Sequence, residues 1–446
     1  MARVLVMIPS GEVYDHDCVR WYNYQDVQKS INHYHNIGDA FVFDSSLKLM
    51  NYDKLGVLPI ADPKMEDIDR LREEYDYVFL RGSNYIHSEM DWRNTIDVLK
   101  RLKLPVLGFG IGAQAPVKGK IELSEQTKTV LHMMADSTTS IGVRGAYTAQ
   151  VLWDIGITNV RIVGCPTAFR QNNPEMRIKL PSLDSVKNVG ITLRREVSPA
   201  YAQDIKRYLT FHRDLVKHLA GRFDDMTLMA QGEPEEKKLV FGSEIQREEA
   251  MQALKNNDWV KNWYLDDTME RLYREKLFYS DVVSDYEDLV RTKDCVLGYR
   301  LHGNLMALSN GVPSIYFTYD SRTVEFAETY QIPSYDVFSE KEFVLEDYWN
   351  QDLFDKFNRA WFQTYREMEQ FLTENNIDHK MVDVMKAEKQ PQRKVACSHP
   401  VWPLWRSGSG SPGGRAFQKV PEPKWATSTR RHGNDGTCNW RRGVYR

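Results

Sequence analysis

The chain of 446 residues and 52.0 kDa is long enough for two or three domains of ordinary size. Hydrophobic residues make up 42% of it and charged residues 27%, which is the composition of a folded globular protein. The formal net charge of -3 excludes a globally basic nucleic-acid-binding protein. No apolar run approaches the roughly 18 residues that a transmembrane helix needs. Five widely spaced cysteines favour reduced thiols, so we expect a soluble, cytoplasmic protein without a resident metal.

Residues 1–180 are predicted to form a first Rossmann-like domain. The pattern predicts short apolar strands and intervening helices, the strands at residues 3–8, 77–80, 105–110, 140–143 and 160–164, and the helices at 91–102, 124–135 and 146–155. Strands that alternate with helices of about ten residues indicate a parallel sheet covered by helices on both faces. The ligand-binding crevice is therefore expected beyond the carboxyl ends of these strands.

The same pattern restarts after a linker near residues 181–187, which predicts a second Rossmann-like domain at residues 188–388. Strands are expected at 189–193, 226–230, 295–298 and 313–317, and helices at 200–221, 285–292, 302–310, 323–330 and 355–374. The pattern does not place an acidic helical region that includes Trp259 and Trp263. The predicted fold class is α/β, with two Rossmann-like domains that face a cleft.

The composition changes after residue 388. From Lys389 to the end, twelve Lys or Arg residues stand against two acidic ones, among many Gly and Pro residues and few aliphatic ones. Such a segment buries too little apolar surface to offset the entropy of ordering it, so residues 389–446 are predicted to be a basic disordered tail. We favour an extension without a role over an arm for an acidic partner such as membrane lipid or a polyanionic glycan.

The most informative stretch is residues 294–317, which reads as a strand, a tight turn, a helix and a second strand. The turn places Arg300 and His302 at the carboxyl edge of the sheet, where the free N–H groups of the helix favour an anion. Arg300 is suited to grip a carboxylate or phosphate with two parallel hydrogen bonds, and His302 to exchange a proton near neutral pH. A structural ion-paired arginine and a buried histidine are the alternative for these residues.

This stretch resembles the polysaccharide pyruvyl transferase family through Gly298-Tyr-Arg-Leu-His-Gly and the later Gly311-Val-Pro. The resemblance covers about residues 30–330, and other pieces follow the family's order: Asn36-Ile-Gly-Asp39, Tyr77-Val-Phe-Leu-Arg-Gly-Ser-Asn84, Gly108-Phe-Gly-Ile-Gly112 and Ile141-Gly-Val-Arg144. Two positions depart from the family pattern. Arg81 begins a segment where the family carries glycines, and Cys165 stands where the family has an aspartate. Both departures bear on the acceptor side of the cleft.

The resemblance implies a GT-B-like arrangement and the transfer of pyruvate from phosphoenolpyruvate to two hydroxyls of one sugar, which forms a cyclic ketal. Phosphoenolpyruvate is then a co-substrate, and no cofactor is expected. The catalytic candidates are His302 and Arg300, and the donor-binding candidates are Arg300, Leu301, His302, Gly303, Arg194 and Arg195. The acceptor-side candidates are Asn36, Gly38, Asp39, Arg81, Asn84, Gly110, Gly112 and Arg144.

Arg194 and Arg195 follow a predicted strand, at a place where the family carries an arginine. Neighbours on a strand point to opposite faces, and the apolar alternation along residues 189–193 places Arg195 on the apolar face. Strand ends break such registers, so the sequence leaves open which of the two arginines faces the site. A surface ion pair with Glu196 is the alternative for either.

The acceptor is expected to be a sugar of an exopolysaccharide or cell-surface glycan precursor, including a lipid-linked oligosaccharide. No transmembrane segment is expected, which leaves open peripheral association with the inner face of the membrane. A GT-B-like sugar-nucleotide glycosyltransferase is the first alternative, and Glu325 is the nearby carboxylate that its ribose-binding site would use. A non-catalytic glycan-binding relative is the second. Asp320 is a second-choice acid–base group.

Removal of residues 389–446 is expected to leave folding and activity intact, because the tail adds little apolar surface to a core. The thermal midpoint and turnover of residues 1–388 should match those of the full chain. A loss of either would show that the tail has a structural or functional role.

Overall fold

The computed structural model describes residues 2–7, 12–15, 18–21, 30–32, 36–58, 65–88, 90–195, 198–199, 202–223 and 225–383. All of these belong to the first of two compact units, Met1–Gln390 and Pro391–Arg446. The predicted tail, residues 389–446, lies outside the described residues. Glu196, the alternative partner of Arg194 and Arg195, also lies outside them.

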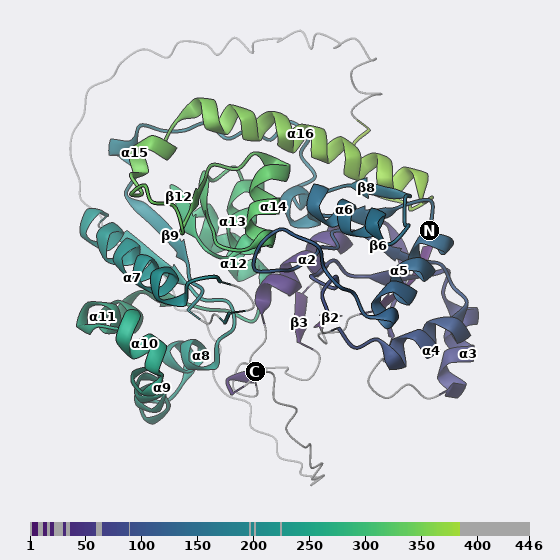
Figure 1. The fold of residues 1–446 in the computed structure, drawn as a ribbon, viewed down its shortest axis with the longest axis horizontal. Coiled ribbons are helices and arrows are strands. Elements are labelled where there is room, and N and C mark those ends of the chain that lie inside the picture. Colours follow the sequence, from purple (N-terminus) through teal and green to yellow (C-terminus); the bar gives the residue numbers. More distant parts are fainter. Residues whose placement is uncertain are drawn as a thin grey trace, which may run out of the picture. The chain divides into compact units, whose positions relative to one another are not determined.

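Four parallel strands form the first sheet in the order β4-β1-β5-β6 (Figure 1). Strands β7 and β8 pair separately in parallel, and an isolated bridge between Ile111 and Val143 connects β7 with the segment after β6. Strands β2 and β3 are antiparallel. The elements of this part are β1 (Ala2–Met7), β2 (Glu12–Asp15), β3 (Cys18–Trp21), α2 (Ile37–Leu49), β4 (Tyr52–Leu58), α3 (Met65–Glu74), β5 (Tyr77–Leu80), α4 (Arg93–Leu102), β6 (Val106–Gly108), α5 (Glu125–Ser137), β7 (Ile141–Val143), α6 (Ala146–Asp154), β8 (Val160–Ile162) and the 3₁₀ turn η1 (Pro166–Phe169).

Alternate residues of the central strand β1 enter two different hydrophobic cores. Val4 and Val6 pack with residues of α2, whereas Leu5 and Met7 pack with residues of α4 and α5. Successive side chains of a strand point to opposite faces, so this division shows that the sheet is covered on both sides.

Six parallel strands form the second sheet in the order β11-β10-β9-β12-β13-β14. The chain order reverses between β9 and β12, which in open α/β sheets is where a ligand-binding crevice opens. The elements are η2 (Leu183–Ser185), β9 (Asn188–Thr192), α7 (Ile205–Arg222), β10 (Asp225–Met229), α8 (Pro234–Phe241), α9 (Glu244–Asn256), α10 (Asp258–Trp263), α11 (Asp267–Lys276), β11 (Leu277–Phe278), α12 (Val283–Arg291), β12 (Cys295–Gly298), α13 (Leu301–Ser309), β13 (Ser314–Thr318), α14 (Ser321–Tyr330), β14 (Ser334–Asp336), α15 (Leu345–Tyr348) and α16 (Gln351–Glu374).

The long helix α16 follows the second sheet in sequence and returns to the first part of the chain (Figure 1). It contacts α14, β8 and η1, and Arg161 on β8 binds Glu367 and Glu374 on this helix. One hydrophobic core contains residues of both parallel sheets, from Val4 to Leu372. The two sheets are therefore joined by side-chain packing as well as by the chain connection.

The α/β fold class and most predicted elements are confirmed, within a few residues at their ends. The acidic region that the pattern did not place forms helices α8 to α11. Helix α2 was not predicted, because it is buried on nearly all sides and lacks the apolar stripe of a surface helix. Strand β4 was also missed, because it is an edge strand with several exposed residues.

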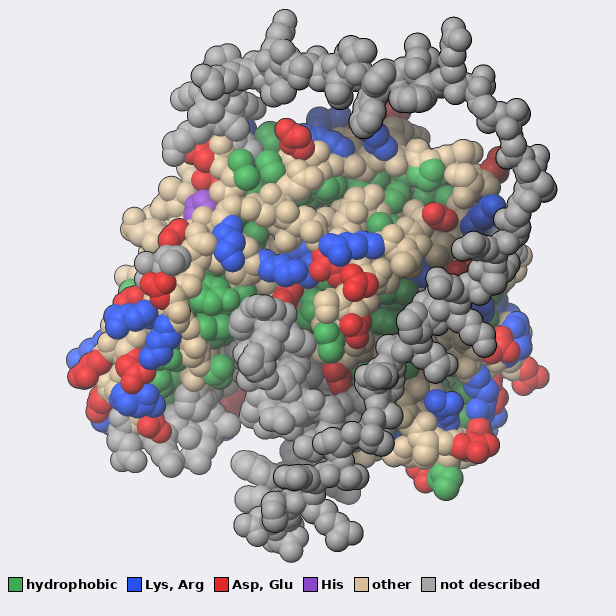
Figure 2. Space-filling model, turned by 180° about the vertical axis from the view of Figure 1, so that it is seen from behind, with side chains coloured by type: hydrophobic (Ala, Val, Ile, Leu, Met, Phe, Trp, Pro, Cys, Tyr) green, Lys and Arg blue, Asp and Glu red, His purple; other side chains and the backbone are tan. Residues whose placement is uncertain are grey.

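On the face shown in Figure 2, basic and acidic side chains lie interspersed, with small hydrophobic areas between them. No helix among the described residues is both long and apolar enough to cross a bilayer. In the same part of the chain, no three His, Cys, Asp or Glu side chains are grouped to hold a metal ion.

A buried ion-pair network ties the chain after η1 to helices α2 and α12. The Arg170 guanidinium donates to both Glu287 carboxylate oxygens at 3.0 and 2.6 Å. It also donates to Asp44 at 2.8 Å and to the Ser45 hydroxyl at 3.0 Å. Burial favours a raised pKa at Glu287, but Arg170 outweighs it and holds the pKa at about 2.

The substitution Arg170→Met is expected to lower the free energy of unfolding by about 3–5 kcal/mol, because it leaves buried carboxylates without their counter-ion. Urea denaturation measures this difference. Arg93→Met is the control, since Arg93 pairs only with its exposed neighbour Asp91, and it should leave the midpoint unchanged.

Wild type and Arg170→Met should also respond differently to acid. The folded pKa of Glu287 lies below its ordinary value of 4.5, so its contribution is present above pH 4.5 and is lost as pH falls towards 2. The gap between wild type and Arg170→Met should close over that range. A gap that stays constant would show that Glu287 does not carry the effect.

Candidate functional site

The turn between β12 and α13 holds the Arg-Leu-His block where the sequence predicted it. Gly298 has φ 142°, and a Cβ there would lie 2.4 Å from the Thr192 hydroxyl, so only glycine allows β9 and β12 to approach this closely. The Thr192 hydroxyl accepts the Arg300 N–H at 3.1 Å and donates to Asn304 at 2.8 Å. Asn304 donates to the Gly298 carbonyl at 2.9 Å. These bonds fix the backbone at the switch point of the second sheet.

The Arg300 side chain points into the protein beside this turn. Its Nε donates to the Leu193 carbonyl at 2.7 Å, and its Nη2 forms a buried ion pair with Glu233. Glu233 immediately precedes α8, in the acidic region that the sequence did not place. The sequence therefore gave no signal for this partner of Arg300, which lies 67 positions away.

Arg195 and Arg194 differ in their surroundings. The Arg195 side chain is buried and pairs with Glu235 at 2.8 Å and Glu236 at 3.6 Å. Arg194 is half-buried, and its guanidinium lies 5.5 Å from the centre of the Tyr319 ring. The partners of Arg195 lie on α8.

Two glutamates next to Arg300 and Arg195, Glu233 and Glu236, have pKa values that are shifted in opposite directions. Burial opposes ionisation of Glu233, but Arg300 and Arg195 outweigh it and lower its pKa. Burial and the neighbouring Glu233 charge raise the pKa of Glu236 well above its ordinary value. Its carboxyl group also accepts a hydrogen bond from Tyr273 at 3.2 Å.

His302 is buried in the first turn of α13, where residues of the first part of the chain surround it. A Cβ on Gly38 would lie 3.1 Å from His302 Nδ1, Gln231 Oε1 and Asn36 Oδ1, so these groups enclose Gly38. The His302 ring meets the Phe326 ring edge-on, with centroids 6.1 Å apart. Its Nε2 has no hydrogen-bond partner. Gln231 was not predicted, because it lies just after β10 in a loop without a motif.

The predicted acceptor-side residues come together next to His302. Asn36 caps α2 by accepting the Gly38 N–H at 3.1 Å, and Asp39 in the first turn lies 3.4 Å from the Arg81 guanidinium. The remaining members of this group surround Arg144. Its guanidinium donates to the Asn84 side chain and to the Gly110 carbonyl. It also fills the space that a side chain at Gly112 would need. The structure thus brings both predicted residue sets to one region.

The three guanidinium groups of Arg81, Arg144 and Arg322 act on His302. Burial lowers the pKa of His302, and these positive charges lower it further, well below 6.5. His302 is consequently neutral at physiological pH. Arg322 was not predicted, since it stands at an ordinary helix start.

Three other candidates have structural partners. Asp320 caps α14 by accepting the Thr323 N–H at 2.9 Å, and it also pairs with Arg322. Glu325 accepts the N–H and the hydroxyl of Thr148 at 2.7 and 2.9 Å, which joins α14 to α6. Cys165 is a buried free thiol, and burial raises its pKa, so the residue beside Arg144 is uncharged.

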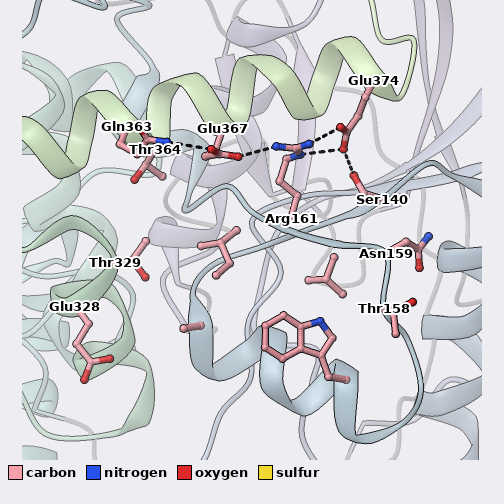
Figure 3. A pocket seen from close by; sticks show the side chains of 14 residues that line it. Ser140, Thr158, Asn159, Arg161, Glu328, Thr329, Gln363, Thr364, Glu367 and Glu374 are labelled. Atoms are coloured by element: carbon pink, nitrogen blue, oxygen red, sulfur yellow. Dashed lines mark hydrogen bonds and ion pairs between the residues drawn. The ribbon is translucent and has the colours of Figure 1, made fainter.

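A separate surface groove of about 680 Å³ lies among α6, β8, α14 and α16 (Figure 3). Its lining residues include none of the predicted site residues. Trp153 is 47% exposed on this groove, and Arg161 is held there by Glu367 and Glu374 (Figure 3).

The family model described as polysaccharide pyruvyl transferase matches residues 36–321. No protein of curated function matches the sequence. Among solved structures, the chain is similar to the UDP-GlcNAc 2-epimerase of Methanocaldococcus jannaschii in complex with UDP-GlcNAc and UDP, with 14% identity, coverage of 87% of this chain and 98% of that chain, and a TM-score of 0.40.

Two further solved structures are similar at the same low level. The S. aureus MnaA–UDP co-structure has 11% identity, coverage of 85% of this chain and 99% of that chain, and a TM-score of 0.39. The glycosyltransferase SnogD from Streptomyces nogalater has 11% identity, coverage of 75% and 76%, and a TM-score of 0.30.

The His302 ring is expected to remain neutral from pH 7 down through the usual histidine range near 6.5, because its pKa is lowered in the fold. Ring ¹⁵N chemical shifts of histidine-labelled protein measure this, and the spectrum of His302→Gln identifies the signal. A midpoint near 6.5 for that signal would contradict the arrangement of arginines around His302.

Proposed function

The chain belongs to the polysaccharide pyruvyl transferase family, and we propose that it transfers pyruvate from phosphoenolpyruvate to two hydroxyls of a sugar in a polysaccharide or its precursor. The family match, which includes the whole Arg300-Leu301-His302 turn, carries this proposal. An exopolysaccharide or cell-surface glycan precursor is the proposed acceptor.

The arrangement of the turn suits an anionic donor. Arg300, Leu301, His302 and Gly303 stand at the amino end of α13, where backbone N–H groups favour negative charge. Phosphoenolpyruvate carries a carboxylate and a phosphate, and we assign Arg300 and this helix end to one of them. Arg195 lies in the same cluster, linked to Arg300 through Glu233 and Glu236.

The first proposed step is an addition to the donor double bond. One sugar hydroxyl forms a C–O bond to the carbon that bears the phosphate, and the vinyl methylene becomes a methyl group. The proton that leaves the hydroxyl and the proton that reaches the methylene pass through His302 or a water that it holds. The His302 Nε2 has no hydrogen-bond partner among the described residues, so it is open to exchange these protons.

The second proposed step is a substitution at the same carbon. The second sugar hydroxyl forms a C–O bond as the bond to phosphate breaks, and the hydroxyl proton leaves with inorganic phosphate. The products are the cyclic ketal and phosphate, so the step needs no oxidant and no further co-reactant. Arg300 and the α13 N–H groups stabilise the departing charge.

The contacts of Glu325 favour this reaction over sugar-nucleotide transfer. Both carboxylate oxygens already accept hydrogen bonds from Thr148. A glycosyltransferase would need that carboxylate for ribose hydroxyls, at the cost of the link between α6 and α14. A non-catalytic glycan-binding relative would bind sugar without consuming the donor.

Thermal stability of the full chain with added ligands separates these functions. A ligand at 100 times its dissociation constant stabilises a protein by about 2.7 kcal/mol. Phosphoenolpyruvate is expected to raise the melting temperature more than a UDP-sugar does. A shift with the UDP-sugar alone would favour the glycosyltransferase.

The substitution His302→Ala is expected to lower turnover by at least about 10²-fold, because it removes the group that moves both protons. Donor binding should largely remain. Arg300→Lys should also lose turnover, since an ammonium group cannot replace a fork that binds Leu193 and Glu233 together. Phosphate release and mass spectrometry of the sugar product measure the reaction.

Arg177→Lys is the control, because Arg177 is exposed and lies outside the predicted site; it donates to nearby backbone carbonyls and lies 5.4 Å from the centre of the Phe362 ring. It should retain wild-type turnover. Near-wild-type turnover in His302→Ala would remove His302 from the catalytic role.

A further inference from the structure

Arg144 differs from the other buried arginines in its partners. The side chain is 1% exposed, yet no ion pair joins it to a carboxylate anywhere in the described part of the chain. Its guanidinium donates to the Asn84 amide oxygen and to the Gly110 carbonyl, and it lies 4.8 Å from the centre of the Phe326 ring. Within the part of the chain that the structure describes, its Nε has no hydrogen-bond partner. A buried cation with neutral partners and an unused N–H group has a strong electrostatic preference for an anion.

Two other polar side chains, those of His302 and Gln231, have buried atoms without a hydrogen-bond partner in the described part of the chain. These atoms are His302 Nε2 and Gln231 Nε2. The Phe326 ring contacts the Arg144 guanidinium on one side and the His302 ring on another. Arg81 and Arg322 add two further positive charges that act on His302 together with Arg144.

We propose that Arg144, with Arg81 and Arg322, forms an oxyanion site beside His302 that binds a phosphate group of a substrate. A phosphate has enough oxygens to accept hydrogen bonds from several guanidinium groups at once. Arg144 provides the uncompensated charge, and the two other arginines provide the surrounding field. The assignment of this phosphate to the donor rests on the proposed function, whereas the oxyanion site itself does not.

The other buried arginines have charged partners of their own. Arg300 pairs with Glu233, and Arg195 pairs with Glu235 and Glu236, so an anion that approaches them meets carboxylates as well. Arg161 in the groove of Figure 3 makes three hydrogen bonds to Glu367 and Glu374, at 2.6 to 2.9 Å. Unlike these arginines, Arg144 has no carboxylate within ion-pair distance in the described part of the chain, although Glu325 and Asp39 act on it from farther away.

A bound phosphate would change the protonation of His302. The groups that act on the ring are the guanidinium groups of Arg144, Arg81 and Arg322, with their nearby carboxylates Asp39, Asp320 and Glu325. A dianion placed among the three arginines offsets their repulsion of a protonated imidazole. Phosphate binding is therefore coupled to proton uptake by His302.

Isothermal titration calorimetry with inorganic phosphate tests the site. Wild type, Arg144→Met, Arg144→Lys and the control Arg161→Met are titrated as full chains, each checked for a cooperative thermal transition. The dissociation constant is expected to rise about tenfold or more in Arg144→Met, less in Arg144→Lys, and to stay within about twofold in Arg161→Met. Titration of wild type in buffers of different ionisation enthalpy should show proton uptake that is absent in His302→Gln.

Two results would overturn the proposal. One is phosphate binding to Arg144→Met with wild-type affinity, and the other is a wild type that binds neither inorganic phosphate nor phosphoenolpyruvate. If Arg144→Met fails to fold, the proton-uptake measurement on wild type decides, and absence of uptake contradicts the site.

Parallel titrations with phosphoenolpyruvate and with a sugar phosphate identify the source of the bound group. If Arg144→Met loses affinity for phosphoenolpyruvate alone, the site belongs to the donor. If it loses affinity for the sugar phosphate alone, the site belongs to an anionic acceptor. Arg144-dependent phosphate binding without consumption of phosphoenolpyruvate would uphold the site and refute the proposed function. Full turnover in Arg144→Met would uphold the proposed function and refute the phosphate site.

Discussion

The cost of burying guanidinium groups constrains the region between the two sheets. Six arginines are buried among the described residues: Arg81, Arg144, Arg170, Arg195, Arg300 and Arg322. Each buried charge loses hydration worth several kcal/mol unless acceptors replace the lost water. For five of the six, the chain meets this demand by placing a carboxylate on a helix or just before one, in contact with the arginine. The positions of α2, α8, α12 and α14 are accordingly tied to the arginines that their acidic residues contact.

This constraint separates two kinds of arginine at the site. Arg300 and Arg195 belong to a network with Glu233, Glu235 and Glu236, whose carboxyl groups lie in contact with them. Such a network holds the loops after β9 and β12 in place. Arg144, by contrast, has no ion pair with a carboxylate in the described part of the chain, and the proposed phosphate site beside His302 rests on this difference. The second part of the chain provides the reactive turn, and the first provides much of the positive charge.

The sequence predicted those features that depend on local pattern. Buried strands between glycine-rich turns predicted both parallel sheets. The alternation along residues 189–193 left open which of Arg194 and Arg195 faces the site, and the structure buries the Arg195 side chain. Helix α2 gave no signal, because a helix that is buried on nearly all sides has no amphipathic period. The pairing of Arg300 with Glu233 could not be predicted either, since it joins loops of different βα units. The proximity of Arg144 to His302 depends on how the two sheets pack, which no local pattern encodes.

The neutrality of His302 follows from the same charges and has a chemical consequence. A histidine that stays neutral among arginines does not protonate a double bond in the free protein, since it has no proton to give beyond the one on its other nitrogen. An anion that enters the arginine cluster reverses this by stabilising the imidazolium form. The group that makes His302 a competent acid would then arrive with the substrate itself. Proton transfer by His302 would then be confined to the complex with the substrate.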